Sequence, residues 1–131
     1  MSALRVRFRL DFSPVCSVGP GKIALLEAIE ASGSLSEAAR RLNMSYRRAW
    51  LLLDSLNSAF DQRVVNLSTG GKGGGGAELT PLARELIKAY QQLEAEVLHS
   101  AQQAFANLPA RARITSKACA PVRKLTRSRS E

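Results

Sequence analysis

The sequence predicts a mainly α-helical domain that contains a β-hairpin. Apolar residues recur at helical spacing in several separate segments between residues 20 and 105. Six of the nine glycines are gathered at residues 70–76, around Lys72, and this run lies between two predicted helices. Glycine allows positive φ angles and a close approach of the backbone to a ligand, as a hairpin tip at a phosphate requires. The order helix, glycine-tipped hairpin, helix is that of a winged helix-turn-helix, with a flexible linker as the alternative for the glycine run.

The length and charge of the chain suggest one domain followed by a basic tail. A chain of 131 residues has about the length of one domain. Its formal charge of +8 favours a polyanionic partner, but residues 110–131 hold seven basic residues and one acidic residue, most of the excess. We therefore predict a winged-helix domain at residues 1–106, with a long helix at about 80–105, and a flexible basic tail at residues 107–131.

The sequence offers little to support an enzyme or a metal site. Cys16 and Cys119 are far apart, which fits free thiols in a cytoplasmic protein, and His99 is isolated. The phosphate-loop pattern GxxxxGK[ST] fails, because Asn66 stands at its first glycine and Gly73 at its Ser or Thr. No apolar run reaches the length of a membrane span, and the alternating N-terminus is unlike a signal peptide. We expect a cytoplasmic protein with no catalytic residues, no metal, no cofactor and no membrane partner.

The first predicted elements are a strand and a helix. Residues 4–12 alternate apolar side chains with charged ones, mostly arginines, which predicts a half-buried strand. Its arginine face is either solvated or in contact with DNA or another partner. A helix follows from about Pro20 to Ala31 and ends at Ser32-Gly33.

Two further helices follow with recognisable N-caps. Ser34 is the predicted cap of a short helix, with Glu37 completing a capping box, and an apolar stripe runs through Leu35, Ala38, Ala39 and Leu42. Ser45 is the predicted cap of the next helix, which runs to about Phe60. A helical wheel gathers one set of side chains on a single side of this helix, and we expect these to form its core face. They are Tyr46, Ala49, Trp50, Leu53, Leu56 and Phe60.

The hairpin and the long helix complete the domain. Residues 64–67 are the predicted first wing strand and residues 77–79 its return, after which Thr80 caps the long helix and Pro81 takes its first position. The long helix carries an apolar stripe that exceeds the needs of a small core and suggests pairing with a second copy. Packing within its own domain is the alternative. The stripe consists of Leu82, Leu86, Tyr90, Leu93 and Val97.

The helix-turn-helix and the wing supply the predicted DNA-binding residues. Arg47 and Arg48 can each donate two hydrogen bonds to O6 and N7 of guanine, and Leu51 can meet a thymine methyl group unless it is a covered surface leucine. Arg40 and Arg41 contact phosphates or are simply solvated. The predicted DNA-binding residues are Ser34, Ser36, Ser45, Arg47, Arg48, Leu51, Gly71, Lys72, Gly73 and Gly74.

Several of these motifs resemble the N-terminal DNA-binding domain of molybdate-responsive transcriptional regulators, the ModE family. The similarity covers about residues 20–98. It implies a LysR-like winged helix-turn-helix that dimerises on double-stranded DNA and regulates genes of molybdenum uptake and use. The motifs are Ser34-Leu35-Ser36, Ser45-Tyr46, Ala49-Trp50, the glycine run from Thr69 to Ala77, and Leu79-Thr80.

The resemblance also implies a second, molybdate-binding domain, and the residues after the long helix show no strand pattern for one. We therefore expect that this chain binds no molybdate by itself and that a separate molybdate-binding protein supplies any signal. The predicted function is sequence-specific transcriptional regulation by a homodimer on a pseudo-palindromic site. Two alternatives are a nucleoid-type DNA-binding protein of low specificity and a winged-helix module that binds other proteins.

Overall fold

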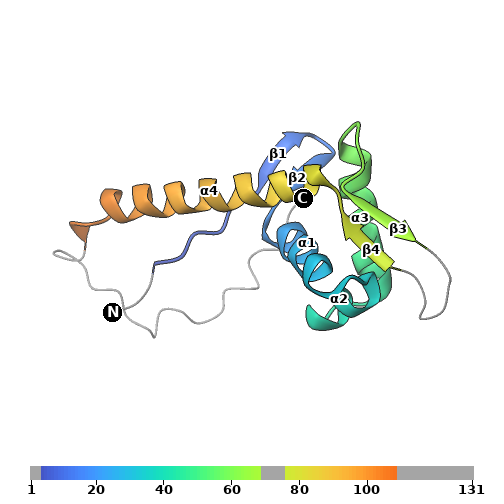
Figure 1. The fold of residues 1–131 in the computed structure, drawn as a ribbon. Helices are drawn as coiled ribbons and strands as arrows, with labels where there is room; N and C mark the ends of the chain where they lie inside the picture. The colour runs from blue at the N-terminus through green and yellow to red at the C-terminus, as the bar shows by residue number, and fades with distance from the viewer. Residues whose placement is uncertain (1–3, 69–75, 109–131) are drawn as a thin grey trace. The chain divides into compact units, whose positions relative to one another are not determined.

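The computed structural model describes residues 4–68 and 76–108. The chain divides into two units between Leu98 and His99, and the hydrophobic core lies in the first unit. In chain order (Figure 1) the helices and strands of the described residues are β1 (Leu10–Ser13), β2 (Cys16–Val18), α1 (Pro20–Ser32), α2 (Leu35–Arg41), α3 (Tyr46–Ala59), β3 (Val65–Ser68), β4 (Gly76–Leu79) and α4 (Pro81–Ala104).

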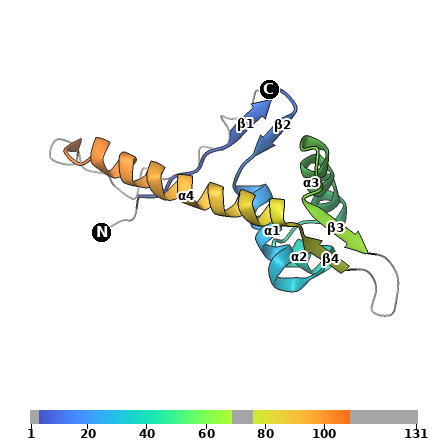
Figure 2. The ribbon, with the colours of Figure 1, turned by 45° about the horizontal axis from the view of Figure 1, so that its top comes forward.

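The predicted fold class is confirmed: the domain is a mainly α winged helix-turn-helix. Helix α1 packs against α2, and α2 packs against α3. Strands β3 and β4 pair antiparallel, from Val65 opposite Leu79 to Ser68 opposite Gly76, and β4 lies against α1 (Figure 2). The hairpin predicted on either side of the glycine run is therefore present.

Helix α1 ends where its sequence predicts an end. Gly33 has a φ of 75°, in the left-handed region that favours glycine, and its N–H donates to the carbonyl oxygen of Ile29 at 2.7 Å. This cap turns the chain sharply, so that α2 can begin two residues later.

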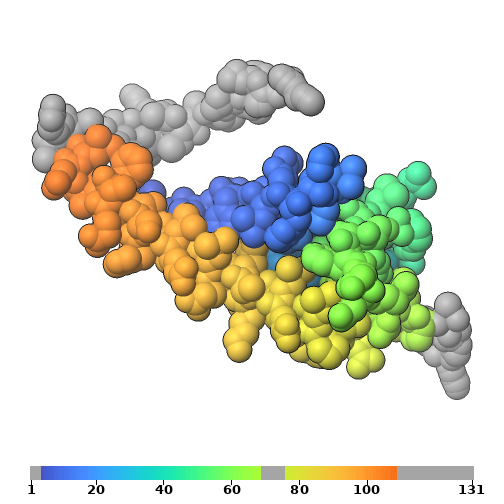
Figure 3. Space-filling view, turned by 90° about the horizontal axis from the view of Figure 1, so that it is seen from above, coloured from blue at the N-terminus to red at the C-terminus, as the bar shows by residue number. Residues whose placement is uncertain are grey.

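The N-terminal strand is predicted too long. Val6 and Phe8 are half-buried and alternate with exposed arginines, but strand pairing begins only at Leu10, and Phe12 is 56% exposed. The reason is tertiary, since this segment packs on α4 instead of joining a sheet (Figure 3). The ring of Phe8 stacks on that of Tyr90 with centroids 4.8 Å apart, and the Tyr90 hydroxyl donates to the Phe8 carbonyl at 2.8 Å.

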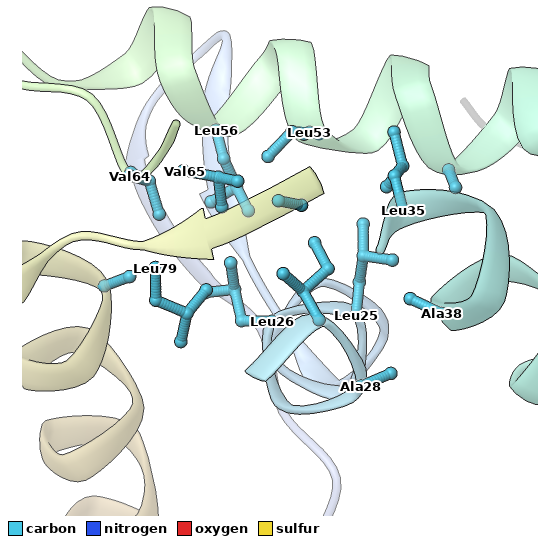
Figure 4. Packing of buried hydrophobic residues seen from close by; sticks show 14 of the residues in the cluster. Leu25, Leu26, Ala28, Leu35, Ala38, Leu53, Leu56, Val64, Val65 and Leu79 are labelled. Carbon is cyan, nitrogen blue, oxygen red and sulfur yellow. The ribbon is translucent and has the colours of Figure 1, made fainter. Parts of the chain in front are cut away.

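The core is built from aliphatic side chains, as the low aromatic content of the chain requires. Figure 4 shows leucines of α1 and α3 meeting around the strand β4. No polar or charged residue is buried within residues 4–68 and 76–108. The largest fully buried side chains are Val18, Leu25, Leu26, Ile29, Leu53, Leu56, Val64 and Val65.

The apolar stripe of α4 is used in part by its own domain. Leu82 and Leu86 pack against the core, and Tyr90 is only 5% exposed because it contacts Phe8. Leu93 and Val97 are half-buried. Packing within the domain thus accounts for the first part of the stripe, and pairing with a second copy stays a prediction.

Candidate nucleic-acid interface

The short turn between α2 and α3 holds the two helices in a helix-turn-helix. Asn43 adopts a φ of 56°, a left-handed conformation that asparagine tolerates better than most residues. Its N–H donates to the carbonyl of Arg40 at 3.2 Å, and the N–H of Met44 donates to the carbonyl of Ala39 at 3.0 Å. Small buried side chains at Ala39 and Ala49 leave room for the two helices to approach. The turn therefore sets the direction in which α3 begins.

Helix α2 has one half of the predicted capping box. The Ser34 hydroxyl accepts from the N–H of Glu37 at 3.1 Å, which confirms the cap. The reciprocal bond is absent, because the N–H of Ser34 donates to Ser32 and the Glu37 carboxylate pairs with Arg40 at 3.0 Å and Arg41 at 3.5 Å. Exposed ion pairs of this kind contribute little, so both arginines remain able to turn towards a phosphate.

The start of α3 is capped, exposed and positively charged. The Ser45 hydroxyl accepts from the N–H of Arg48 at 3.1 Å, as predicted. Arg47 and Arg48 are both exposed, and neither joins an ion pair with any residue that the structure describes. The partial positive charge of a helix N-terminus adds to theirs. A polyanion can therefore reach two guanidinium groups and the first turn of the helix together.

The expectation that Tyr46 and Trp50 belong to the core is wrong. Tyr46 is 54% exposed and Trp50 is 42% exposed, whereas Leu51 is 49% exposed as predicted. Only the stripe of Ala49, Leu53 and Leu56 is buried on α3. At about 100° per residue, positions 46 and 50 fall at the edge of that stripe, where the sequence alone does not tell whether a neighbour covers them. Both side chains instead line a shallow hollow together with Arg47 and Leu51.

The base of the wing is attached next to the start of α2. The N–H of Ala77 donates to the carbonyl of Gly33 at 2.9 Å, and the N–H of Gly76 donates to the Ser68 hydroxyl at 3.2 Å. Ser36 is exposed on α2 close by in sequence, whereas Ser34 is half-buried by its capping role. The remaining predicted wing residues, Gly71, Lys72, Gly73 and Gly74, lie outside the described residues.

Two sets of contacts that position α3 were not predicted from the sequence. The Lys22 ammonium group donates to the carbonyl of Ser17 at 2.7 Å and to the Ser55 hydroxyl at 3.0 Å, joining β2, α1 and α3. The Asn57 side-chain oxygen accepts from the N–H groups of Val64 at 2.7 Å and Val65 at 3.2 Å. A lysine and an asparagine on helical faces carry no local signal of these distant partners.

Thr80 links the wing to the long helix. Its hydroxyl accepts from the N–H of Ala83 at 3.3 Å, which confirms the predicted cap of α4. The same hydroxyl lies within hydrogen-bond distance of the carbonyls of Arg63 at 2.8 Å and Val64 at 3.1 Å. One side chain therefore ties the start of α4 to the start of β3.

These elements together define a winged helix-turn-helix of the DNA-binding class.

None of the helices within residues 4–68 and 76–108 combines the length and the apolar character needed to span a bilayer. In the same ranges, no three or more His, Cys, Asp or Glu residues gather as a metal site would need.

The comparisons with known proteins agree with this class. Residues 21–84 match the family model of the bacterial regulatory helix-turn-helix protein, lysR family. The fold is similar to that in a crystal structure of the CbnR_DBD-DNA complex, with a TM-score of 0.51 and 16% identity over 67% of this chain and 95% of that one.

Comparison with curated relatives identifies a narrower family than the lysR family model does. The chain is 45% identical to the molybdenum-pterin-binding protein MopB of Rhodobacter capsulatus, over 61% of this chain and 30% of that protein. It is 41% identical to the molybdenum transport protein ModE of Herbaspirillum seropedicae, over 66% and 34%. It is 42% identical to the DNA-binding transcriptional dual regulator ModE of Escherichia coli (strain K12), over 56% and 28%. The chain therefore carries an N-terminal DNA-binding domain of the ModE family, and it spans about a third of the length of these relatives.

Proposed function

We propose that this protein is a sequence-specific transcriptional regulator linked to molybdenum metabolism, which acts in the cytoplasm and binds a pseudo-palindromic DNA site as a homodimer. The observation that carries the proposal is the start of α3, where a capped helix end presents Arg47 and Arg48 without ion-pair partners in the described part of the chain. A helix fits the major groove, where a guanidinium can bind both acceptors of a guanine.

Other groups around α3 suit phosphates. Ser36 is exposed on α2, and Arg40 and Arg41 are held only by surface ion pairs. Lys72, the glycine N–H groups of the wing and the basic residues at 110–131 would add affinity that is independent of sequence, through release of counterions. In this proposal α3 reads the bases, and the phosphate contacts of α2, the wing and the basic residues at 110–131 hold the protein in position on the DNA.

The dimer and the molybdenum link have separate support. Leu93 and Val97 remain partly exposed on α4, and two paired copies would place their recognition helices about 34 Å apart, one turn of DNA. The link to molybdenum rests on the names of the relatives, such as the molybdenum transport protein ModE. In this proposal the chain alone binds no molybdate, and a separate molybdate-binding protein would supply the signal.

A selection of binding sites tests the proposal directly. The protein is incubated with a random duplex library, the bound duplexes are sequenced, and the affinity for the enriched site is compared with that for a scrambled duplex across a salt series. An enriched palindrome and a clear preference for it support the proposal. Equal affinity for both duplexes would indicate a nucleoid-type protein, and no binding at low salt would indicate a protein-interaction module.

Sedimentation and calorimetry test the remaining parts of the proposal. The free protein should sediment as a dimer at micromolar concentration, and titration with molybdate should release or absorb no heat of binding. A monomer at that concentration would contradict the dimer. Stoichiometric micromolar binding of molybdate would contradict the need for a separate sensor.

A further inference from the structure

Helix α3 exposes an apolar surface at the position where a DNA-reading helix is expected to be polar. Tyr46 is 54% exposed, Trp50 is 42% exposed and Leu51 is 49% exposed, and the three line one shallow hollow with Arg47. We call Tyr46, Trp50 and Leu51 the α3 apolar patch. Exposed large apolar side chains that cluster in this way usually mark a binding surface.

The position of the α3 apolar patch limits what can cover it. The patch lies on the first two turns of α3, beside Arg47, and in this class of protein the beginning of the second helix meets the base edges of the major groove. Base edges in that groove are hydrogen-bond donors and acceptors with one apolar exception, the 5-methyl group of thymine. A tryptophan and a leucine that enter the groove therefore have one apolar partner available among the bases.

The spacing of the patch matches about three consecutive base pairs. Tyr46 and Trp50 are four residues apart, which is about 6 Å along a helix. Successive base pairs are about 3.4 Å apart, so the patch extends over about two base-pair steps. Arg47 lies between the two aromatic residues in the sequence and shares their hollow, so a guanine contact and methyl contacts can be made together.

We propose that the α3 apolar patch reads thymine methyl groups, so that Tyr46 and Trp50 determine specificity together with Leu51. The recognised half-site then contains thymines within about two base pairs of the guanine that Arg47 contacts. The sequence suggested this role for Leu51 alone, and the exposure of the two aromatic residues extends it. The inference rests on the proposed DNA-binding function and adds the chemical group that is read.

Replacing thymine by uracil removes only the methyl group and keeps every hydrogen-bonding group of the base. Each thymine of the site enriched from the random library is replaced singly by deoxyuridine, and the affinity of the full chain is measured. At a contacted position the affinity should fall about fourfold, the effect of one buried CH₂ group. Thymines outside the two half-sites serve as controls and should show no change.

Variants assign the effect to the patch. In Trp50→Gln the thymine and uracil duplexes should bind equally well at one or more of the positions where the wild-type protein distinguishes them, namely those that Trp50 contacts. Leu51→Gln, at a more exposed position, provides a second variant should Trp50→Gln melt at a lower temperature by circular dichroism. Arg48→Ala should bind more weakly but keep the preference for thymine, since Arg48 is outside the hollow.

The outcomes separate this inference from the function on which it rests. Wild-type protein that binds its enriched site with less than a twofold effect of uracil at every position would overturn the inference and leave the proposed function standing. A preference for thymine that stays undiminished at every such position in both patch variants would also overturn it. A library that yields no enriched site would overturn the proposed function and this inference with it.

Discussion

Replacing Asn57 by alanine should destabilise the domain by about 2–4 kcal/mol. The Asn57 side chain accepts hydrogen bonds from the N–H groups of Val64 and Val65, and it donates to the Val65 carbonyl at 3.4 Å. Val64 and Val65 are both 0% exposed, so water cannot replace the lost partner without opening the junction of α3 and β3. Each buried N–H left without a partner costs about 1–3 kcal/mol, and the two costs add with some relief from local rearrangement.

Urea unfolding followed by circular dichroism measures this loss. With a denaturant slope of about 1–2 kcal/mol/M for a small domain, the midpoint should fall by on the order of 2 M while the slope stays constant. Asn66→Ala is the matched control, because Asn66 is an exposed asparagine on the neighbouring strand β3. A loss for Asn57→Ala that is below 1 kcal/mol, or equal to that of the control, would refute the argument.

Three further predictions concern DNA binding and ionisation. Arg47→Ala should lower the binding free energy by about 1–3 kcal/mol on the enriched site and by much less on random duplex. The control Arg84→Ala makes the same charge change on α4 and should lower the binding free energy by the same small amount on both duplexes. Equal losses on both duplexes for Arg47→Ala would make Arg47 a phosphate contact. Lys72→Ala should weaken binding to every sequence and make the affinity less dependent on salt. For the wild-type protein, neutralisation of about six phosphates should lower the affinity on the order of 10³-fold between 50 and 200 mM salt. Burial and the nearby Glu94 raise the pKa of Tyr90 above 10.0, so its neutral form favours the folded state below pH 10 and this stabilisation is lost as the pH rises. Absorbance at 295 nm of Tyr46→Phe should show the Tyr90 transition above pH 10, and a midpoint at or below 10 would contradict this.

The elements of this fold were largely predictable because their ends are encoded locally. Gly33 ends α1, Ser34 caps α2, Ser45 caps α3 and Thr80 caps α4, each as the sequence predicts. A capping hydroxyl reaches an N–H only two or three residues away, so the short-range sequence contains both partners. The same holds for the hairpin, whose two strands flank the glycine run. These features together were sufficient to predict the class of the protein.

The positions of the N-terminal segment and of α3 depend on contacts between distant parts of the chain. Phe8 stacks on Tyr90, 82 residues away, and this contact draws the N-terminal segment onto α4 and out of a sheet. Lys22 holds Ser55 across 33 residues. Such pairs leave no periodic trace, because a helix or strand pattern records that a side chain is covered and not by which element.

Helix α3 shows most clearly which features the local sequence determines and which depend on the tertiary structure. Its apolar periodicity correctly predicts a helix with a buried stripe through Ala49, Leu53 and Leu56. Tyr46 and Trp50 satisfy the same periodicity, yet the neighbouring elements leave them open to solvent. The sequence determines which residues can share a face of the helix, through the fixed rotation per residue. Only the tertiary structure decides how much of that face is covered, because the width of the covered stripe depends on where the other helices and the wing pack.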